Sequence, residues 1–310
     1  MITIDIKGAF LKAKKTEDME LIVKMDGELA ELLCKINPKF MKEENGEMYL
    51  KYKVSSKSRE QLDEVAYVLR SIYTDITVTT DQTHDYLGMV MSHNKESKQV
   101  TINLEKYIQD MIDCFKDEVP EEKIKKVTTL AMNNLFKTRS DSANKVIKQK
   151  ASIFHATVAK LFFIAKRARP DILLVISFLT TRVEEPDEDD WNKLKRVFGY
   201  LSQTPNFHLT LSCENLNKLT WYVDGSYTSQ PDMRGQSGAV LLAGDCAVLF
   251  RSNKQEVNTR SLTETELIAI DDSLPMIQWT KNFLREQGYD LETGIREDNG
   301  STMLFMKNRR

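Results

Sequence analysis

Cysteine is scarce and scattered in this sequence. The 310 residues contain four, at Cys34, Cys114, Cys213 and Cys246. No two of them form a Cys-x-x-Cys pair, and no histidine lies beside them at the spacing of a zinc site, so neither a zinc finger nor a disulfide framework is expected. Reduced, idle thiols are typical of an intracellular protein, which we expect to be cytoplasmic or nuclear.

Long apolar runs are also missing. The longest strongly apolar stretch, residues 172–179, is far shorter than the ~20 residues that a membrane span needs. The N-terminal residues show no basic segment followed by an apolar core, so no signal peptide is expected. Ile2, Ile4 and Ile6 instead alternate with polar residues, as in a strand already under way. We therefore expect no membrane partner, and a reading frame that begins inside a domain.

The third absence is an excess of charge of one sign. The 44 Lys and Arg residues are balanced by 46 Asp and Glu residues, which gives a net charge of −2. No global basic field therefore indicates nucleic-acid binding, and any such contact must come from local clusters. The apolar fraction of 41% is sufficient for hydrophobic cores, and a chain of this length accommodates about two domains.

The periodicity of apolar residues changes twice along the chain. Strand-like patterns come first, and helical spacing begins at Leu104. A run of three helices follows, the first ending before Pro170 and the second beginning at it. The acidic residues 184–190 are expected to cap the third helix. After Pro205, strands return, followed by a helix over about 262–287 that Pro275 should kink or interrupt.

Three carboxylates in the last third of the chain carry the chemistry. Asp224 and Asp298 lie where strands should end, and Glu266 lies in the first turns of the long helix. Acidic side chains that converge from such positions form a cage for divalent metal, and their hard oxygen ligands suit magnesium. Two such ions can split or join phosphodiesters.

Acidic residues at such positions also have structural roles, and taken singly each of these carboxylates is explained by one. Ser261 and Glu264 have the spacing of a capping box, so Glu264 is expected to cap its helix while Glu266, on a different face, is free to reach the sheet. Asp298, between a strand and a helix, is a candidate N-cap.

The order of these motifs resembles the ribonuclease H domain of copia-type retrotransposons. The matching segments are Tyr222-Val-Asp-Gly-Ser, Ser261-Leu-Thr-Glu-Thr-Glu-Leu and Asp298-Asn-Gly-Ser. Upstream, Asp5-Ile-Lys-Gly-Ala-Phe resembles the first catalytic motif of the family's reverse transcriptase, and His84-Asp-Tyr-Leu-Gly resembles its primer-grip turn. Lys166-Arg-Ala-Arg-Pro-Asp resembles the helical segment that joins polymerase to nuclease.

This resemblance implies a mixed α+β and α/β chain in three parts. Residues 1–103 would be a remnant of the reverse-transcriptase fingers and palm, 104–206 a helical thumb or connection segment, and 217–310 a truncated ribonuclease H-like α/β domain. In the polymerase remnant, Asp5 would bind metal and Phe10 would stack under the sugar. In the nuclease, Asp224, Glu266 and Asp298 would hold magnesium or manganese for cleavage of RNA in RNA–DNA hybrids.

The chain departs from the family pattern at two places. Residues 47–58 read Glu-Met-Tyr-Leu-Lys-Tyr-Lys-Val-Ser-Ser-Lys-Ser, without the expected Val-Asp-Asp hairpin, as if an earlier segment were fused to a later one. We expect no polymerase activity, because Asp5 alone cannot hold two metal ions. The family's nuclease ends with a further His and a fourth carboxylate on a final helix. This chain stops at Arg310 without them, so we expect slowed hydrolysis.

Basic residues concentrate on the helical segment. They are either solvated helix faces or contacts that follow the phosphates of an RNA–DNA hybrid without reading sequence. The candidates are Lys166, Arg167, Arg169, Arg182, Lys193, Lys195 and Arg196.

Three hypotheses for function remain open. The chain is a weak, metal-dependent ribonuclease within a copia-type Pol protein, a non-catalytic module that binds RNA–DNA hybrid, or a decayed transposon remnant without function. The sequence does not indicate an oligomeric state.

Overall fold

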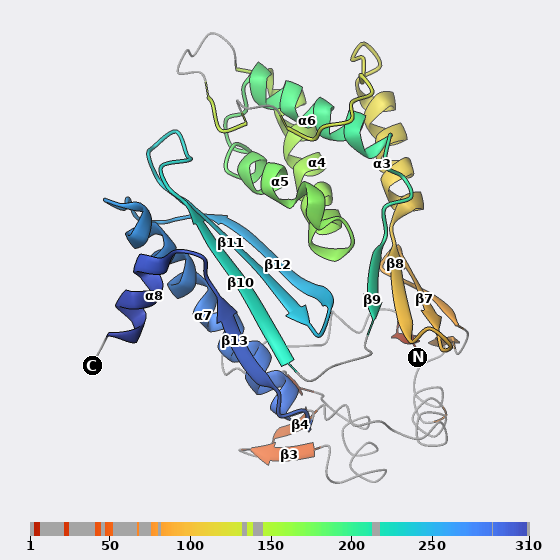
Figure 1. Ribbon diagram of the computed structural model, residues 1–310. Helices are drawn as coiled ribbons and strands as arrows, with labels where there is room; N and C mark the ends of the chain where they lie inside the picture. The colour runs from red at the N-terminus through yellow and green to blue at the C-terminus, as the bar shows by residue number, and fades with distance from the viewer. Residues whose placement is uncertain are drawn as a thin grey trace. The chain divides into compact units, whose positions relative to one another are not determined.

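The computed structural model describes residues 82–308, except 132–134, 139–144, 213–217 and 287, together with Tyr67 and five short strands nearer the N-terminus (Figure 1). The chain divides into two compact units. One contains residues 1–84 and 282–290, and the other contains residues 85–281 and 291–310. The boundaries of the three expected parts, at residues 103 and 206, stay a prediction.

The N-terminal unit contributes two small sheets. Its strands are β1 (Thr3–Ile6), β2 (Ile22–Lys24), β3 (Met41–Glu44), β4 (Glu47–Lys51) and β5 (Ile76–Thr79). β1 pairs antiparallel with β5, and β4 lies between β2 and β3. The strand expected from the alternating isoleucines is confirmed, with Asp5 opposite Thr77 in the β1–β5 pair. Phe10 lies outside the described residues.

The larger unit begins with a hairpin sheet in the order β6-β7-β8-β9. Its strands are β6 (Thr83–Tyr86), β7 (Met89–Asn94), β8 (Gln99–Asn103) and β9 (Leu209–Ser212). Leu87 and Gly88, between β6 and β7, have φ angles of 53° and 76°. This left-handed backbone explains the glycine, because a residue without Cβ adopts it at little cost.

The helical segment of this unit contains the expected run of helices. Its elements are α3 (Glu105–Glu118), α4 (Lys148–Arg167), the 3-10 turn η4 (Pro170–Ile172), α5 (Leu173–Thr180) and α6 (Glu188–Leu201). Asp187 and Asp190 form a reciprocal capping box at the start of α6, as each side chain accepts a hydrogen bond from the other's backbone amide. The capping role predicted for residues 184–190 is therefore confirmed. In the part of the chain that is described, no helix combines the length and apolarity of a membrane-crossing segment.

Aromatic rings form the centre of the helical core. The Phe115 ring of α3 lies 5.5 Å from the Trp191 ring and 4.5 Å from the Phe198 ring, both on α6. Trp191 is fully buried and donates its indole N–H to Glu122 at 2.9 Å. Lys150 of α4 and Lys195 of α6 donate to the same carboxylate at 2.6 and 2.7 Å. Glu122 therefore ties two helices and the central aromatic ring together.

The last sheet has the strand order β12-β11-β10-β13. Its elements, with the two helices beside it, are β10 (Lys218–Ser226), β11 (Gln236–Ala243), β12 (Cys246–Lys254), α7 (Leu262–Glu286), β13 (Glu292–Arg296) and α8 (Gly300–Lys307). β10 pairs antiparallel with β11 and parallel with β13. α7 continues through Pro275, with Ile270 and Ile277 buried on both sides, so the helix is not interrupted there, and the alternative of a kink stays a prediction.

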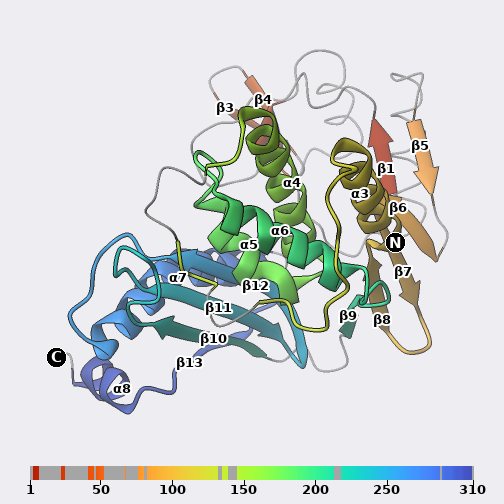
Figure 2. The same cartoon turned by 90° about the horizontal axis from the view of Figure 1, so that it is seen from above.

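The helical segment is joined to this sheet along β12. Ser177 of α5 donates its hydroxyl to the Ser252 carbonyl at 2.6 Å, and Lys166 of α4 donates to the Phe250 carbonyl at 2.9 Å. α5 runs beside β12 in both views (Figure 1, Figure 2). Mixed α and β structure, with helices before an α/β layer, matches the expected fold class at this coarse level.

The Glu122 cluster predicts a pH-dependent contribution to stability. Burial alone would raise the pKa of Glu122, but hydrogen bonds from Lys150, Lys195 and Trp191 outweigh it and lower the pKa from 4.5 to about 2. A lowered native pKa adds stability above the unfolded value, and this stability is lost as pH falls from about 4.5 through about 2. We expect Glu122→Gln to cost about 2 kcal/mol of unfolding free energy near pH 7, with a smaller cost at low pH. Urea unfolding across this range measures both.

Glu121→Gln is the matched control, because Glu121 is exposed and adjacent in sequence. Equal stability of the two variants at neutral pH would show that the Glu122 cluster does not hold the helices together.

Candidate metal centre

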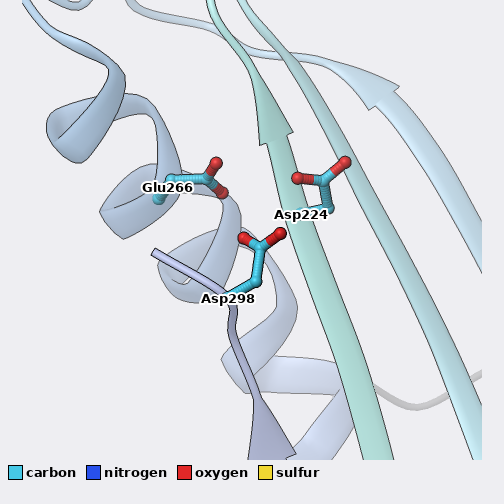
Figure 3. A group of neighbouring side chains, drawn as sticks. All are labelled: Asp224, Glu266 and Asp298. Carbon is cyan, nitrogen blue, oxygen red and sulfur yellow. The ribbon is translucent and has the colours of Figure 1, made fainter. Parts of the chain in front are cut away.

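Asp224, Glu266 and Asp298 converge in the larger unit. Each offers a carboxylate oxygen, and these three oxygens lie within 4.8 Å of one another. Asp224 comes from the end of β10, Glu266 from the first turns of α7, and Asp298 from the segment between β13 and α8. Their carboxylates face a common space (Figure 3). The structure thus brings together the three residues that the sequence analysis grouped.

Glu266 is the buried member of the group. Only 3% of the residue is exposed, and its Oε2 atom is buried without a hydrogen-bond partner. Burial, followed by the negative charges of Glu297 and Asp224, raises the pKa of this carboxyl from 4.5 to about 7. The charge of Asp298 acts in the same direction, and the Gly225 backbone opposes it. An ionised Glu266 therefore needs a compensating positive charge.

Gly225 allows α7 to approach β10 closely. A Cβ atom at this position would lie 2.9 Å from the Thr265 carbonyl oxygen and 3.0 Å from Glu266 Oε2. These distances are shorter than side-chain carbon atoms tolerate, so the neighbouring backbone of α7 would have to move. The missing side chain at position 225 therefore sets the distance between Glu266 and the end of β10.

The start of α7 is capped by residues other than Glu266. Ser261 Oγ accepts a hydrogen bond from the Glu264 amide at 3.2 Å, and Glu264 Oε2 accepts one from the Arg260 amide at 2.6 Å. The structural task predicted for Glu264 is therefore confirmed, although its side chain reaches Arg260 and not the amide of Ser261. Glu266 takes no part in this cap, so its side chain is available to join Asp224 and Asp298.

The N-cap alternative for Asp298 is wrong. The N-cap of α8 is Asn299, whose side-chain oxygen accepts hydrogen bonds from the amides of Ser301 and Thr302 at 3.0 and 3.1 Å. A carboxamide at the next position satisfies the helix terminus, so the exposed carboxylate of Asp298 is free to face Asp224 and Glu266.

A buried amide network also fixes the first turns of α7. Gln255, just after β12, is 1% exposed and donates its side-chain amide to the Thr265 carbonyl and to Ser237 Oγ, both at 3.0 Å. Ser237 in turn donates to Asp272 of α7 at 2.7 Å. Gln255 was not predicted from the sequence, because an isolated glutamine after a strand carries no pattern.

The donor set of the three carboxylates fits a hard divalent cation. Carboxylate oxygens are the preferred ligands of magnesium and manganese, and two of the three side chains are exposed to solvent from which an ion arrives. The unpartnered Glu266 oxygen supports the fit, because a buried acceptor without a donor is costly unless a cation or a proton meets it.

Several of the predicted nucleic-acid-binding residues have partners within the protein, beginning with three on α4, just before η4 and just after α5. Arg169 is 1% exposed and pairs with Asp171 at 2.7 Å. Lys166 donates to the Phe250 carbonyl, and Arg182 lies 2.9 Å from the buried Asp190 carboxylate. Such contacts explain their presence without nucleic acid, and their binding role stays a prediction.

The remaining predicted basic residues lie on two surfaces. Arg167 is exposed at the end of α4, with its guanidinium 5.9 Å from the Phe163 ring. Lys193, Lys195 and Arg196 of α6 line a cavity of about 470 Å³. Its lining also includes Lys123 and Lys125, which the sequence analysis did not select.

The cations on α6 are themselves partly engaged. Lys193 donates to the Lys137 carbonyl at 2.7 Å, Lys195 donates to Glu122 at 2.7 Å, and Arg196 donates to Thr129 Oγ1 at 2.6 Å. The cavity nonetheless gathers five basic side chains against one acidic lining residue, Asp189.

Comparison with known proteins gives retrotransposon relatives. No protein-family model matches the chain. The retrovirus-related Pol polyprotein from transposon RE2 of Arabidopsis thaliana is 31% identical over 124 residues, which are 40% of this chain and 8% of that protein. The Pol polyprotein from transposon TNT 1-94 of Nicotiana tabacum is 25% identical over 228 residues, 72% of this chain and 17% of that protein. The chain thus spans under a fifth of either polyprotein.

A short protein and a solved structure are also similar. Secreted RxLR effector protein 161 of Plasmopara viticola is 28% identical over 126 residues, 40% of this chain and 88% of that protein. The structure of the foamy viral protease-reverse transcriptase in complex with RNA/DNA hybrid has 11% identity and a TM-score of 0.46, and the match covers 97% of this chain and 39% of that chain. The structural likeness is remote.

The close contact at Gly225 predicts a strong effect of one methyl group. Gly225→Ala would push the first turns of α7 away from β10, and overpacking of this kind costs about 1–3 kcal/mol. Gly238→Ala is the control on the paired strand, since its Cβ would meet only the Asp224 carbonyl oxygen at 3.7 Å. Thermal unfolding should show a lower midpoint for Gly225→Ala than for the control. Equal midpoints would mean that the contact between α7 and β10 accommodates a methyl group at position 225 without cost.

Proposed function

We propose, from the premise that this chain is related to the Pol polyproteins of copia-type transposons, that its last sheet carries a ribonuclease H site. The site would cleave the RNA strand of RNA–DNA hybrids in a reaction that requires divalent metal. The observation that carries this proposal is the convergence of Asp224, Glu266 and Asp298, whose oxygens lie within 4.8 Å of one another.

The three carboxylates would hold magnesium, or manganese in its place. Bound divalent ions would neutralise charge on the phosphate oxygens and, as a pair, stabilise the attacking and leaving oxygens of an in-line displacement. The protein's part is to fix the ligands. Gly225 sets the position of α7, the Gln255 amide holds the Thr265 carbonyl, and Asn299 caps α8 so that Asp298 remains free.

The cavity beside α6 supports contact with a polyanion. Five basic side chains around one hollow favour phosphate groups, and a contact of this kind depends on charge and backbone shape and not on base sequence. In this proposal, Lys123 and Lys125 bind the phosphates of the hybrid together with Lys193, Lys195 and Arg196. Lys166, Arg169 and Arg182 do not line this cavity, and their head groups have protein partners, so they would act chiefly through the fold.

The cavity also favours a second candidate function, a module that binds hybrid without cleaving it. Its lining cations do not depend on the carboxylates, so binding would survive loss of the metal site. A decayed remnant without function predicts neither binding nor cleavage. For the polymerase remnant, we infer no DNA synthesis, since the sequence lacks the Asp-Asp motif that would join Asp5.

Substitution of Asp224 tests the nuclease. Asp224→Asn keeps the size of the side chain and removes one of the charges that the ion needs, so we expect at least a roughly hundredfold loss of hybrid cleavage. The measurement follows a labelled RNA strand in an RNA–DNA hybrid, with magnesium and with a chelator. Asp245→Asn, at an exposed turn between β11 and β12, is the control. Hydrolysis that persists in Asp224→Asn would sink the assignment.

Charge reversal in the cavity tests its proposed binding of the hybrid. Lys123→Glu together with Lys125→Glu should weaken hybrid binding roughly tenfold at low salt and reduce its salt dependence. Lys148→Glu together with Lys160→Glu, both exposed on α4, changes the net charge equally and should have less effect. Fluorescence anisotropy of a labelled hybrid at several salt concentrations compares them. An equal loss in both pairs would assign the effect to net charge and not to the cavity.

A further inference from the structure

The cavity beside α6 has an apolar wall that contact with phosphates does not explain. Its apolar lining residues come from two parts of the fold, with Val127, Leu130, Ala131 and Leu135 following α3 and Val175 lying on α5. Leu135 and Val175 are buried, and Leu130 packs against the helical core. A groove that only follows phosphates needs no such wall, because apolar surface in contact with water is unfavourable. The wall therefore fits the uncharged part of a ligand.

The cations at this cavity differ in how far the protein satisfies them. Lys193, Lys195 and Arg196 each donate a hydrogen bond to a protein oxygen. Lys123 and Lys125 are exposed, and across the described residues neither ammonium group has a hydrogen-bond or ion-pair partner. Two free cations beside three that are held in position leave positive charge that an anion balances.

Contacts between α6 and residues 120–131 fix the two sides of the cavity relative to each other. Arg196 donates to Thr129 Oγ1 at 2.6 Å. Gly199 lies so near the Lys125 carbonyl that a Cβ atom on this glycine would collide with the carbonyl oxygen. Walls that are fixed in this way reduce the entropy that a ligand loses by ordering its site.

We propose that this cavity binds one nucleotide, with its phosphate among the cations and its base against the apolar wall. A nucleotide joins an anionic phosphate to a flat base with apolar faces, so it matches both parts of the lining. The cavity volume of about 470 Å³ is within the range of small-molecule sites. Asn192 of α6 is exposed at the cavity and offers an amide to the polar edge of the base. The inference goes beyond the proposed function, which requires contact with phosphates alone.

The competing explanation is that the apolar wall is only the margin of the helical core. The lysines would then bind phosphate, and a base would add nothing to the affinity. Three probes separate the two explanations. Adenosine 5′-monophosphate (AMP) has both the base and the phosphate, ribose 5-phosphate lacks the base, and adenosine lacks the phosphate.

The experiment titrates each probe into the full chain by isothermal titration calorimetry. A chelator is present throughout, so that divalent metal at the carboxylates takes no part. We expect AMP to bind about tenfold or more tightly than ribose 5-phosphate, because the base leaves water for the apolar wall. Adenosine should also bind more weakly than AMP. This comparison uses the unaltered chain and so does not depend on the folding of a variant. Equal affinities for AMP and ribose 5-phosphate would overturn the inference.

Substitutions locate the bound nucleotide. Lys123→Gln together with Lys125→Gln should weaken AMP binding about tenfold, since two charged donors are removed. Lys148→Gln together with Lys160→Gln, both exposed on α4, is the matched control and should keep the parental affinity. Val127→Thr has nearly the same size and should weaken AMP roughly threefold while ribose 5-phosphate binds as before. AMP affinity that the Lys123 and Lys125 pair leaves unchanged would place the nucleotide elsewhere and overturn the inference.

Competition with a labelled RNA–DNA hybrid, followed by fluorescence anisotropy, separates this inference from the proposed function. Displacement of the hybrid by AMP would support a nucleotide of the bound strand as the occupant of the cavity. AMP binding without displacement would support a free nucleotide, and the proposed contact between cavity and hybrid would then fail. Hybrid binding that is lost in Lys123→Glu with Lys125→Glu, in a chain that does not bind AMP, would overturn the inference and leave the proposed contact intact.

Discussion

The close approach of α7 to β10 at Gly225 is the constraint on which the site depends. A Cβ atom at that position would meet the Thr265 carbonyl at 2.9 Å, so the helix and the strand touch through bare backbone. The contact buries Glu266 and brings its carboxylate to the end of β10, where Asp224 lies. Gln255, which precedes α7 in the chain, donates its side-chain amide to the Thr265 carbonyl and so holds the same helical turn. A wider separation of α7 and β10 would expose Glu266 to water and move its carboxylate away from that of Asp224.

The cost of this contact is electrostatic. A pKa of about 7 for Glu266, against an ordinary 4.5, corresponds to about 3 kcal/mol of disfavoured ionisation. Burial is the first cause, so no rearrangement of the exposed carboxylates alone would relieve it. Without a cation, Glu266 at neutral pH is divided between its protonated form and an ionised form that is repelled by its neighbours. The proposed divalent cation would compensate the charge of Glu266 and so remove this cost.

The elements of this site could be predicted from the sequence, but most of its partners could not. Local patterns in the sequence indicate three of its features. These are the alternating burial along β10, the capping contacts around Ser261 and the three carboxylates. Gln255 and the cation cavity leave no such pattern, because their contacts join residues far apart. Lys195 was selected as a phosphate contact, yet its partner Glu122 lies 73 positions away.

Contacts along β12 link the cation cavity and the carboxylate group through the fold. Lys166 and Ser177 bond to backbone carbonyls of β12, so the helical segment is attached to the sheet that carries the carboxylates. The head group of Lys166 is engaged at β12, and its role in nucleic-acid binding stays a prediction. The cavity on α6 and the carboxylate group belong to the same compact unit. Substitutions in one of these two regions should therefore leave the other intact, because they share an attachment but no side chain.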